Sequence, residues 1–412
     1  MLLRLMLVFE AKLKGTDGQY RILDEVLRTA RFVRNACLRY WMDNPQKNKY
    51  DLNNYCAALA ALYPWAKKLN SMARQASAER AWSAISRFYV SEAGRSPNCK
   101  TKKPGKKGFP KYAKEQTHAS VEYKTCGWKL SEDRREITLT DGFKAGTFRM
   151  WGTRDLHYYQ LDQIKRVRIV RRADGYYVQF CLSQERIEKR EPTGKTVGLD
   201  VGLTHFYTDS NGQTVDNPRH LRKSEKALKR LNCRLSRTQK GSKNRAKARN
   251  RLSRKHLKVS RQRKDFAVKL ARCVVQSNDL VAYEDLQVRN MVKNTKLSKS
   301  ISDAAWSNFR SWLEYFGKVF GVVTVAVPPH YTSANCSNCG ESVKKSLSQR
   351  THRCHQCGFV LDRDWNAARN ILELALRTVG HTGTNVSGEN DLCVGEETPQ
   401  CKPTRRKRNS LK

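Results

Sequence analysis

Four cysteines in the last third of the sequence have the spacing of a tetrahedral metal site. Cys336 and Cys339 form one C-x2-C pair, Cys354 and Cys357 form a second, and a glycine follows each pair. Two such pairs supply four thiolates, which bind zinc at about 2.3 Å. Because four thiolates leave no open position for water, we predict a structural zinc ribbon over residues 335–358.

Three carboxylates form a second candidate site. Asp200 lies in the strand-like segment GLDVGL, Glu284 ends the apolar segment LVAYE, and Asp364 opens a helical pattern in RDWNAARN. A single acid at such a position is usually a cap or turn residue. Together the three suit a pair of divalent cations about 4 Å apart, which needs several hard oxygen ligands. We therefore predict that Asp200, Glu284 and Asp364 are catalytic residues that bind two Mg²⁺ or Mn²⁺ ions.

Neighbouring residues offer alternatives at both sites. His352 or His355 could replace one cysteine, although the two C-x2-C pairs are complete without them. Asp362 rivals Asp364, and Asp285 rivals Glu284. Alternation along a strand points Glu284 and Asp285 to opposite faces, so only one of the two can face the site.

The segments around the three acids indicate an α/β domain. TVGLDVGL, HFYTDS, DLVAYEDL and VVTVAV read as strands, Asn211-Gly212 marks a hairpin, and apolar spacing predicts a helix over about 302–320. Residues 219–264 contain 20 Lys and Arg and a single acid, Glu225. A leucine stripe through this part predicts two long antiparallel helices joined near 240–242.

The N-terminal half has a different organisation. Helical spacing covers about 18–42 and 71–93, with a shorter helix at 52–62. Short alternating strands occupy 118–185, and we predict that they form a small β-barrel completed by the first strand of the chain. The Lys-, Gly- and Pro-rich segment 96–112 reads as an extended linker, and the residues beyond about 380 read as a disordered basic tail.

Composition narrows the class of partner. The 412 residues have a formal net charge of +42 and a pI near 10.1. Because such a charge opposes compaction, it favours a polyanionic partner such as nucleic acid. The sequence shows no run of about 18 apolar residues, so we expect no membrane span. Nine cysteines outside the ribbon lack pairable spacing, which favours a reducing intracellular compartment.

The quoted motifs resemble the TnpB family, transposon-associated relatives of type V CRISPR nucleases. The similarity lies in GLDVGL, YEDL, PPHYTSANCSNCG, RCHQCG and DRDWNAARNI, in that order. It implies an RNase H-like (RuvC) nuclease domain with a zinc ribbon, and an N-terminal wedge β-barrel with a helical insert. The implied domains are wedge 1–14 and 100–190, recognition insert 15–99, RuvC 195–334 and 359–380, ribbon 335–358 and tail 381–412.

The resemblance also implies the partners and the activity. It implies an RNA-guided DNA endonuclease that binds a structured guide RNA, opens double-stranded target DNA beside a short motif and hydrolyses phosphodiesters. The basic helices would contact phosphates, and Arg245, Lys247, Arg249 and Arg251 are the candidates that we name. We expect a monomer on one RNA, in a bacterial or archaeal cytoplasm and associated with the nucleoid.

Two other classes of protein remain to be compared. An RNA-guided DNA binder or repressor would share the fold, but the intact acidic triad argues against it. A protein-only DNA transposase could use a similar set of three acids. It would also need duplex-reading domains, and the sequence shows no helix-turn-helix signal.

Overall fold

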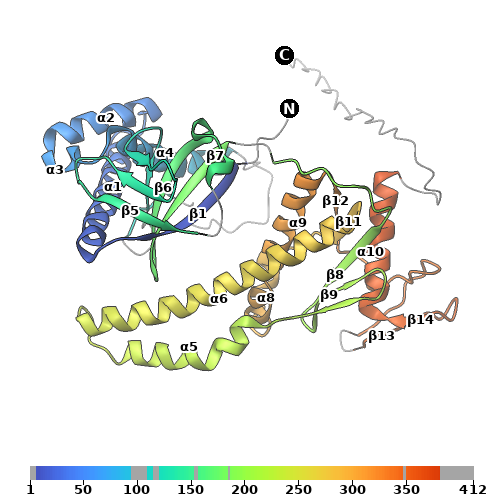
Figure 1. The fold of residues 1–412 in the computed structure, drawn as a ribbon. Coiled ribbons are helices and arrows are strands. Elements are labelled where there is room, and N and C mark those ends of the chain that lie inside the picture. The colour runs from blue at the N-terminus through green and yellow to red at the C-terminus, as the bar shows by residue number, and fades with distance from the viewer. Residues whose placement is uncertain are drawn as a thin grey trace, which may run out of the picture. The chain divides into compact units, whose positions relative to one another are not determined.

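The structure is a computed structural model that describes residues 6–93, 109–114, 120–152, 156–183, 186–346 and 349–380 (Figure 1). The predicted tail 381–412 and most of the predicted linker lie outside these residues. The chain forms two compact units. The first contains Met1–Lys189, Pro218–Ala271 and Asn294–Gly321, and the second contains Arg190–Asn217, Arg272–Lys293 and Val322–Lys412.

An antiparallel sheet of seven strands organises the first unit, in the order β2-β6-β7-β1-β5-β4-β3. Inward residues of these strands, such as Leu13, Phe148 and Phe180, share one core, so the sheet curls around it. The described residues show no pairing between β2 and β3, and the predicted barrel is therefore an open, curled sheet. Its strands are β1 (Met6–Lys14), β2 (Ser120–Tyr123), β3 (Trp128–Leu130), β4 (Glu136–Leu139), β5 (Gly146–Trp151), β6 (Ile164–Arg172) and β7 (Gly175–Ser183).

The described residues between β1 and β2 form the three helices that the periodicity predicts and a fourth short helix, Pro64–Lys67, which it does not. Thr16 and Asn48 begin two of them with capping boxes, in which a side chain at each helix start binds the amide three residues on. These helices have a second core around Val33, Leu38 and Leu52. They are α1 (Asp17–Asp43), α2 (Lys49–Leu62), α3 (Pro64–Lys67) and α4 (Ser71–Ala93).

The basic segment forms the predicted helical hairpin, α5 (His220–Ser236) and α6 (Lys243–Gln276) (Figure 1). The carboxylate of Asp303 accepts hydrogen bonds from the Leu221 and Arg222 amides at the start of α5, and it pairs with Arg263 of α6. Asp303 lies in α8 (Ser298–Ala304), which a left-handed Ala305 separates from α9 (Trp306–Phe320). The helix predicted over 302–320 is therefore two helices. A short α7 (Val288–Met291) precedes them.

The second unit is built on a mixed sheet of five strands, in the order β10-β9-β8-β11-β12. β8 runs antiparallel to β9 and parallel to β11, and β11 is also parallel to β12. Helix α10 (Arg363–Val379) packs so closely on β8 that a Cβ at Gly198 would lie 2.3 Å from the Ala368 carbonyl oxygen. The strands are β8 (Thr196–Val201), β9 (His205–Asp209), β10 (Thr214–Asp216), β11 (Leu280–Glu284) and β12 (Val323–Val327), and a hairpin of β13 (Thr351–Arg353) and β14 (Val360–Asp362) follows.

None of the helices in the described part of the chain has the length and apolarity needed to cross a lipid bilayer.

Candidate active site and metal centre

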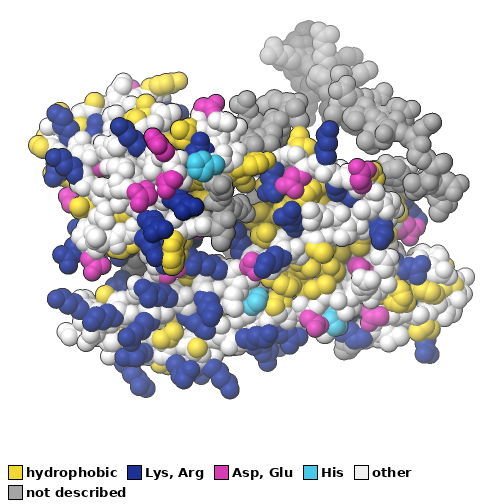
Figure 2. Space-filling model, viewed as in Figure 1, with side chains coloured by type: hydrophobic (Ala, Val, Ile, Leu, Met, Phe, Trp, Pro, Cys, Tyr) yellow, Lys and Arg dark blue, Asp and Glu magenta, His cyan; other side chains and the backbone are white. Residues whose placement is uncertain are grey.

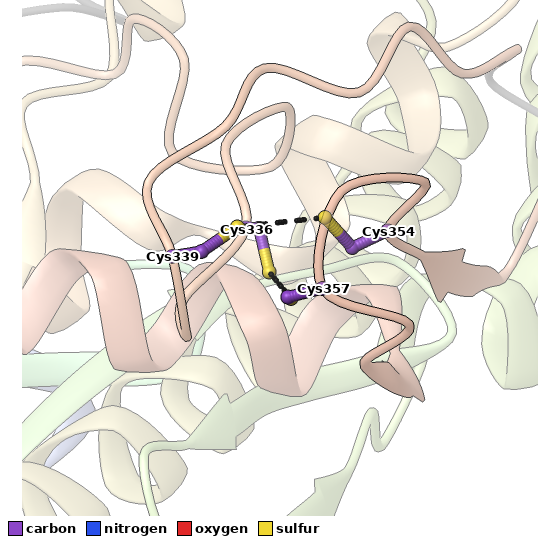
Figure 3. A group of neighbouring side chains, drawn as sticks. All are labelled: Cys336, Cys339, Cys354 and Cys357. Atoms are coloured by element: carbon purple, nitrogen blue, oxygen red, sulfur yellow. Dashed lines mark hydrogen bonds between the residues drawn. The ribbon is translucent and has the colours of Figure 1, made fainter.

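The structure brings the four cysteines together, as their spacing predicts. Their sulfur atoms all lie within 4.8 Å of one another, and the Sγ–Sγ distances are 3.7 Å for Cys336–Cys357 and 3.5 Å for Cys339–Cys354 (Figure 3). A tetrahedron with Zn–S bonds of about 2.3 Å has edges of about 3.8 Å. The four thiolates therefore have the spacing of a zinc site.

Local backbone geometry explains the arrangement of the cysteines. The amide of Gly340 donates to the Cys336 carbonyl at 2.9 Å, and the amide of Gly358 donates to the Cys354 carbonyl at 3.2 Å. Both glycines have positive φ, which closes each C-x2-C turn. A hydrogen bond from the Phe359 amide, with a second from Asn338, lowers the pKa of Cys357 to about 6. A thiolate is the form that binds zinc.

The histidines considered as alternatives lie outside this sulfur cluster. The His352 side chain is fully buried in β13, and its Nδ1 contacts the ammonium of Lys345. Among the described residues, the four cysteines are the sole group of three or more His, Cys, Asp or Glu with ligand atoms this close together.

Two of the three acids lie side by side on adjacent strands of the five-stranded sheet. Leu199 of β8 is paired with Tyr283 of the parallel strand β11, and the next residues are Asp200 and Glu284. Asp364 lies in the first turn of α10, the helix that packs on β8. Residues that are 84 and 164 positions apart in the sequence are therefore neighbours in the second unit.

Burial raises the pKa of two of the acids, and at Asp200 the neighbouring carboxylates raise it further. Burial, followed by the charges of Glu284 and Asp364, raises the pKa of Asp200 well above its usual value, although Arg363 acts in the opposite direction. Burial also raises the pKa of Glu284, against the effect of a hydrogen bond from Thr332. A buried carboxyl group whose pKa is raised by neighbouring carboxylates, as at Asp200, is typical of a functional site.

The structure gives Asp362 and Asp364 different contacts. The Asp362 carboxylate caps α10, because it accepts hydrogen bonds from the amides of Asp364 at 2.8 Å and Trp365 at 3.1 Å. The Asp364 carboxylate instead contacts Arg363 at 2.9 Å and Arg350 at 3.2 Å. Asp362 thus has a structural role as a helix cap.

Several contacts of the acids could not be read from the sequence. Thr332 donates to Glu284, and Arg350 and Arg363 hold Asp364. The indole nitrogen of Trp365 donates to the Ser210 carbonyl at 3.0 Å, which fixes the start of α10 against the β9–β10 turn. Thr332, Arg350 and Trp365 carry no spacing signal, because their contacts join residues 48, 14 and 155 positions apart. Arg363, which is adjacent to Asp364, is one of many arginines in the chain.

The four basic residues named as nucleic-acid contacts fall into two groups. The guanidinium of Arg245 donates to the carbonyls of Leu235 at 3.0 Å and Thr238 at 2.7 Å, so it closes the turn between α5 and α6. The side chains of Lys247, Arg249 and Arg251 are exposed on α6. The sequence predicted one role for all four, but the contacts of Arg245 are internal.

Comparisons with known proteins agree with this architecture. The family model "Probable transposase" matches residues 179–295, and the model "Cas12f1-like, TNB domain" matches residues 306–371. A Streptomyces pristinaespiralis protein named "Putative RNA-guided DNA endonuclease" is 30% identical over 89% of this chain and 89% of its own length. The Escherichia coli protein InsQ, which has the same descriptive name, is 30% identical over 64% of this chain and 68% of its own.

Solved structures show the same fold. A Cas12f1–sgRNA–target DNA complex has a TM-score of 0.51 and 14% identity, over 86% of this chain and 83% of that chain. The mini-RNA-guided endonuclease CRISPR-Cas_phi3 has a TM-score of 0.51 and 9% identity, over 90% of this chain and 92% of that chain. Together with the sequence relatives, these matches define a class of compact proteins with a Cas12f-like fold. The chain belongs to the TnpB family.

Proposed function

We propose that this chain is an RNA-guided DNA endonuclease that hydrolyses phosphodiester bonds at Asp200, Glu284 and Asp364. The supporting observation is the convergence of these acids, which come from two adjacent parallel strands and from the helix packed on them. In the five-stranded sheet, β9 runs opposite to the other four strands, which are parallel to one another. This arrangement suits an RNase H-like (RuvC) domain. We assign that domain to 195–334 and 359–380.

Three carboxylates can supply hard oxygen ligands for two divalent cations about 4 Å apart. Mg²⁺ or Mn²⁺ ions held by them would polarise the phosphodiester and stabilise the leaving oxygen. Arg350 and Arg363 orient the Asp364 carboxylate, and Thr332 orients that of Glu284. The four-cysteine cluster in 335–358 would hold a structural zinc ion.

The basic hairpin supports binding of a guide RNA. Lys and Arg side chains gather over α5 and α6 (Figure 2), and residues 219–264 contain 20 of them. Rows of cations along a helix neutralise phosphates. We propose that this face, with the sheet of 1–14 and 100–190 as a wedge and the helices of 15–99 as a recognition insert, binds guide RNA and double-stranded target DNA, as one protein chain on one RNA.

Plasmid cleavage tests the proposal directly. Protein co-expressed with its guide RNA should cut a plasmid that carries the matching target in the presence of Mg²⁺. Asp200→Ala, Glu284→Ala and Asp364→Asn should abolish cutting and still bind RNA and target. Asp362→Asn is the matched control, because asparagine also caps helices and leaves α10 intact. Cutting by the three active-site variants at the rate of the unaltered protein would refute the assignment.

The family description "Probable transposase" favours DNA strand joining as a second candidate function. The same reaction mixtures distinguish the two functions. A transposase would act without RNA and give joined DNA products, whereas the proposed nuclease requires the RNA and leaves free ends. An RNA-guided repressor would bind the target and cut nothing.

A further inference from the structure

One buried hydroxyl in the second unit contacts a proposed catalytic acid. Thr332 Oγ1 donates a hydrogen bond to Glu284 Oε1 at 2.6 Å, and only 4% of Thr332 is exposed. Thr332 follows the end of β12, whose last residue, Val327, is paired with Glu284. The loop after β12 therefore folds back over the end of β11.

The backbone of this loop is held in an uncommon conformation. The side chain of Tyr331 is largely exposed, and the backbone of this residue has a φ of 65°. This value lies in the left-handed region, which residues other than glycine rarely adopt. Such a conformation persists where its surroundings impose it. The turn at Tyr331 precedes the buried Thr332, whose hydroxyl lies beside Glu284.

Two buried asparagines of α10 supply those surroundings. The side-chain amide of Asn370 donates to the Thr332 carbonyl at 2.7 Å and to the Asn335 carbonyl at 2.8 Å. Asn366, which is fully buried, donates to the same Asn335 carbonyl at 2.7 Å and accepts from the Ser337 amide at 2.9 Å. The Asn335 carbonyl therefore accepts two hydrogen bonds, one from each asparagine.

The result is one network that joins the zinc ribbon to the acids. Asn335 and Ser337 flank Cys336, the first cysteine of the ribbon, and Asn366 lies two residues after Asp364. Helix α10 thus presents Asp364, anchors the base of the ribbon and fixes the loop that carries Thr332. The positions of Glu284 and Asp364 both depend on α10.

We propose that Thr332 is a positioning residue that orients the Glu284 carboxylate for metal binding, and that Asn370 holds Thr332 in place. This inference rests on the proposed function of Glu284. Groups that hydrogen-bond a metal-binding carboxylate set its direction, and their loss typically lowers metal affinity or activity by about 10- to 100-fold.

The test is a Mg²⁺ titration of DNA cleavage by the RNA-loaded protein, with a parallel Mn²⁺-binding titration followed by electron paramagnetic resonance. Thr332→Val keeps the shape of the side chain but removes the donor, so it should raise the Mg²⁺ concentration for half-maximal cutting about 10-fold or more. Thr332→Ser keeps the donor and should restore the original value. Thr378→Val, which removes a hydroxyl that donates to the Leu374 carbonyl near the end of α10, is the control and should not change it. Zinc content and binding of RNA and target DNA should be equal in all four proteins.

Glu284→Ala, assayed in parallel, separates the two possible failures. An unchanged Mg²⁺ dependence in Thr332→Val, with Glu284→Ala inactive, overturns the role of Thr332 alone. Full activity of Glu284→Ala overturns the active site and the role of Thr332 together. If Thr332→Val loses zinc or unfolds, Thr332→Ala, which removes the donor without adding bulk, is judged by the same outcomes.

Discussion

The burial of the ionised Asp200 carboxylate without a bound cation lowers the stability of the folded protein. It lies beside Glu284 and Asp364, and its pKa is raised by burial and by these two charges. The native state therefore keeps the proton at pH values where the unfolded chain, with a pKa near 3.8, has lost it. Because the native state binds more protons, its stability falls as the pH rises above that value and through the native pKa. A metal ion would reverse this penalty.

We therefore predict that Asp200→Asn stabilises the protein at pH 7 in buffer without Mg²⁺, while it abolishes cleavage. The amide keeps the shape of the side chain and removes the buried charge. The melting temperature, measured by calorimetry, should therefore rise. The difference from the unaltered protein should shrink at acidic pH and on addition of Mg²⁺. Asp216→Asn, an almost fully exposed residue of β10, serves as the control. A melting temperature lowered by Asp200→Asn would contradict this account.

At the scale of elements, hydrogen bonds join the four-cysteine segment 335–358 to α10. Asn366 and Asn370 bind the backbone on both sides of Cys336, and Asp364 lies seven positions after Cys357. A ribbon that loses its metal should therefore disturb the start of α10.

Cys336→Ser should lower the zinc content, measured by elemental analysis, and should reduce DNA cutting more than RNA binding. The physical reason is that metal binding stabilises the ribbon fold, and the ribbon positions Asp364 through α10. Cys233→Ser, at an exposed cysteine of α5, is expected to leave both properties unchanged. Full zinc content and a stable ribbon in Cys336→Ser would argue against a four-cysteine site.

The α5–α6 hairpin offers a matched pair of basic residues. Arg245→Ala removes two hydrogen bonds within the turn, so it should lower the free energy of unfolding by about 1–3 kcal/mol. Lys247→Ala, two residues away on an exposed position, should weaken RNA binding without a change in the melting temperature. Thermal unfolding and an RNA filter-binding assay measure the two effects. The prediction fails if Lys247→Ala destabilises the fold as much as Arg245→Ala does.

At the scale of the whole molecule, the charge of +42 governs the choice of partner. Each phosphate neutralised on RNA or DNA contributes about 0.7 to 0.9 to the slope of log K against log salt concentration. Replacement of Lys247, Arg249, Arg251 and Lys258 by alanine should therefore flatten this slope by roughly 3. Cutting should fall as the RNA is lost, and excess RNA should partly restore it. Equal cutting of duplex DNA by RNA-free protein would refute the guided mechanism.

Local patterns were sufficient for the parts of the protein that depend on short-range chemistry. The C-x2-C pairs predict the four-cysteine cluster, because the ligands of each pair are three residues apart. Apolar periodicity predicts α1 and α2 to within a few residues, and the structure adds the capping boxes of Thr16 and Asn48 at their starts. β3 was not predicted, since three residues are too few to show alternation.

The choice between neighbouring residues depended on the tertiary structure. The sequence favours Asp364 over its rival Asp362, and the structure adds that the Asp362 carboxylate binds the free amides at the start of α10. Arg245 and Lys247 are equally basic, yet only Arg245 reaches the carbonyls of the turn. Thr332 meets Glu284 across 48 residues. Residue type and spacing determine which chemistry is available. Contacts between distant segments depend on packing, because packing sets how closely a helix approaches a strand, as α10 approaches β8 at Gly198.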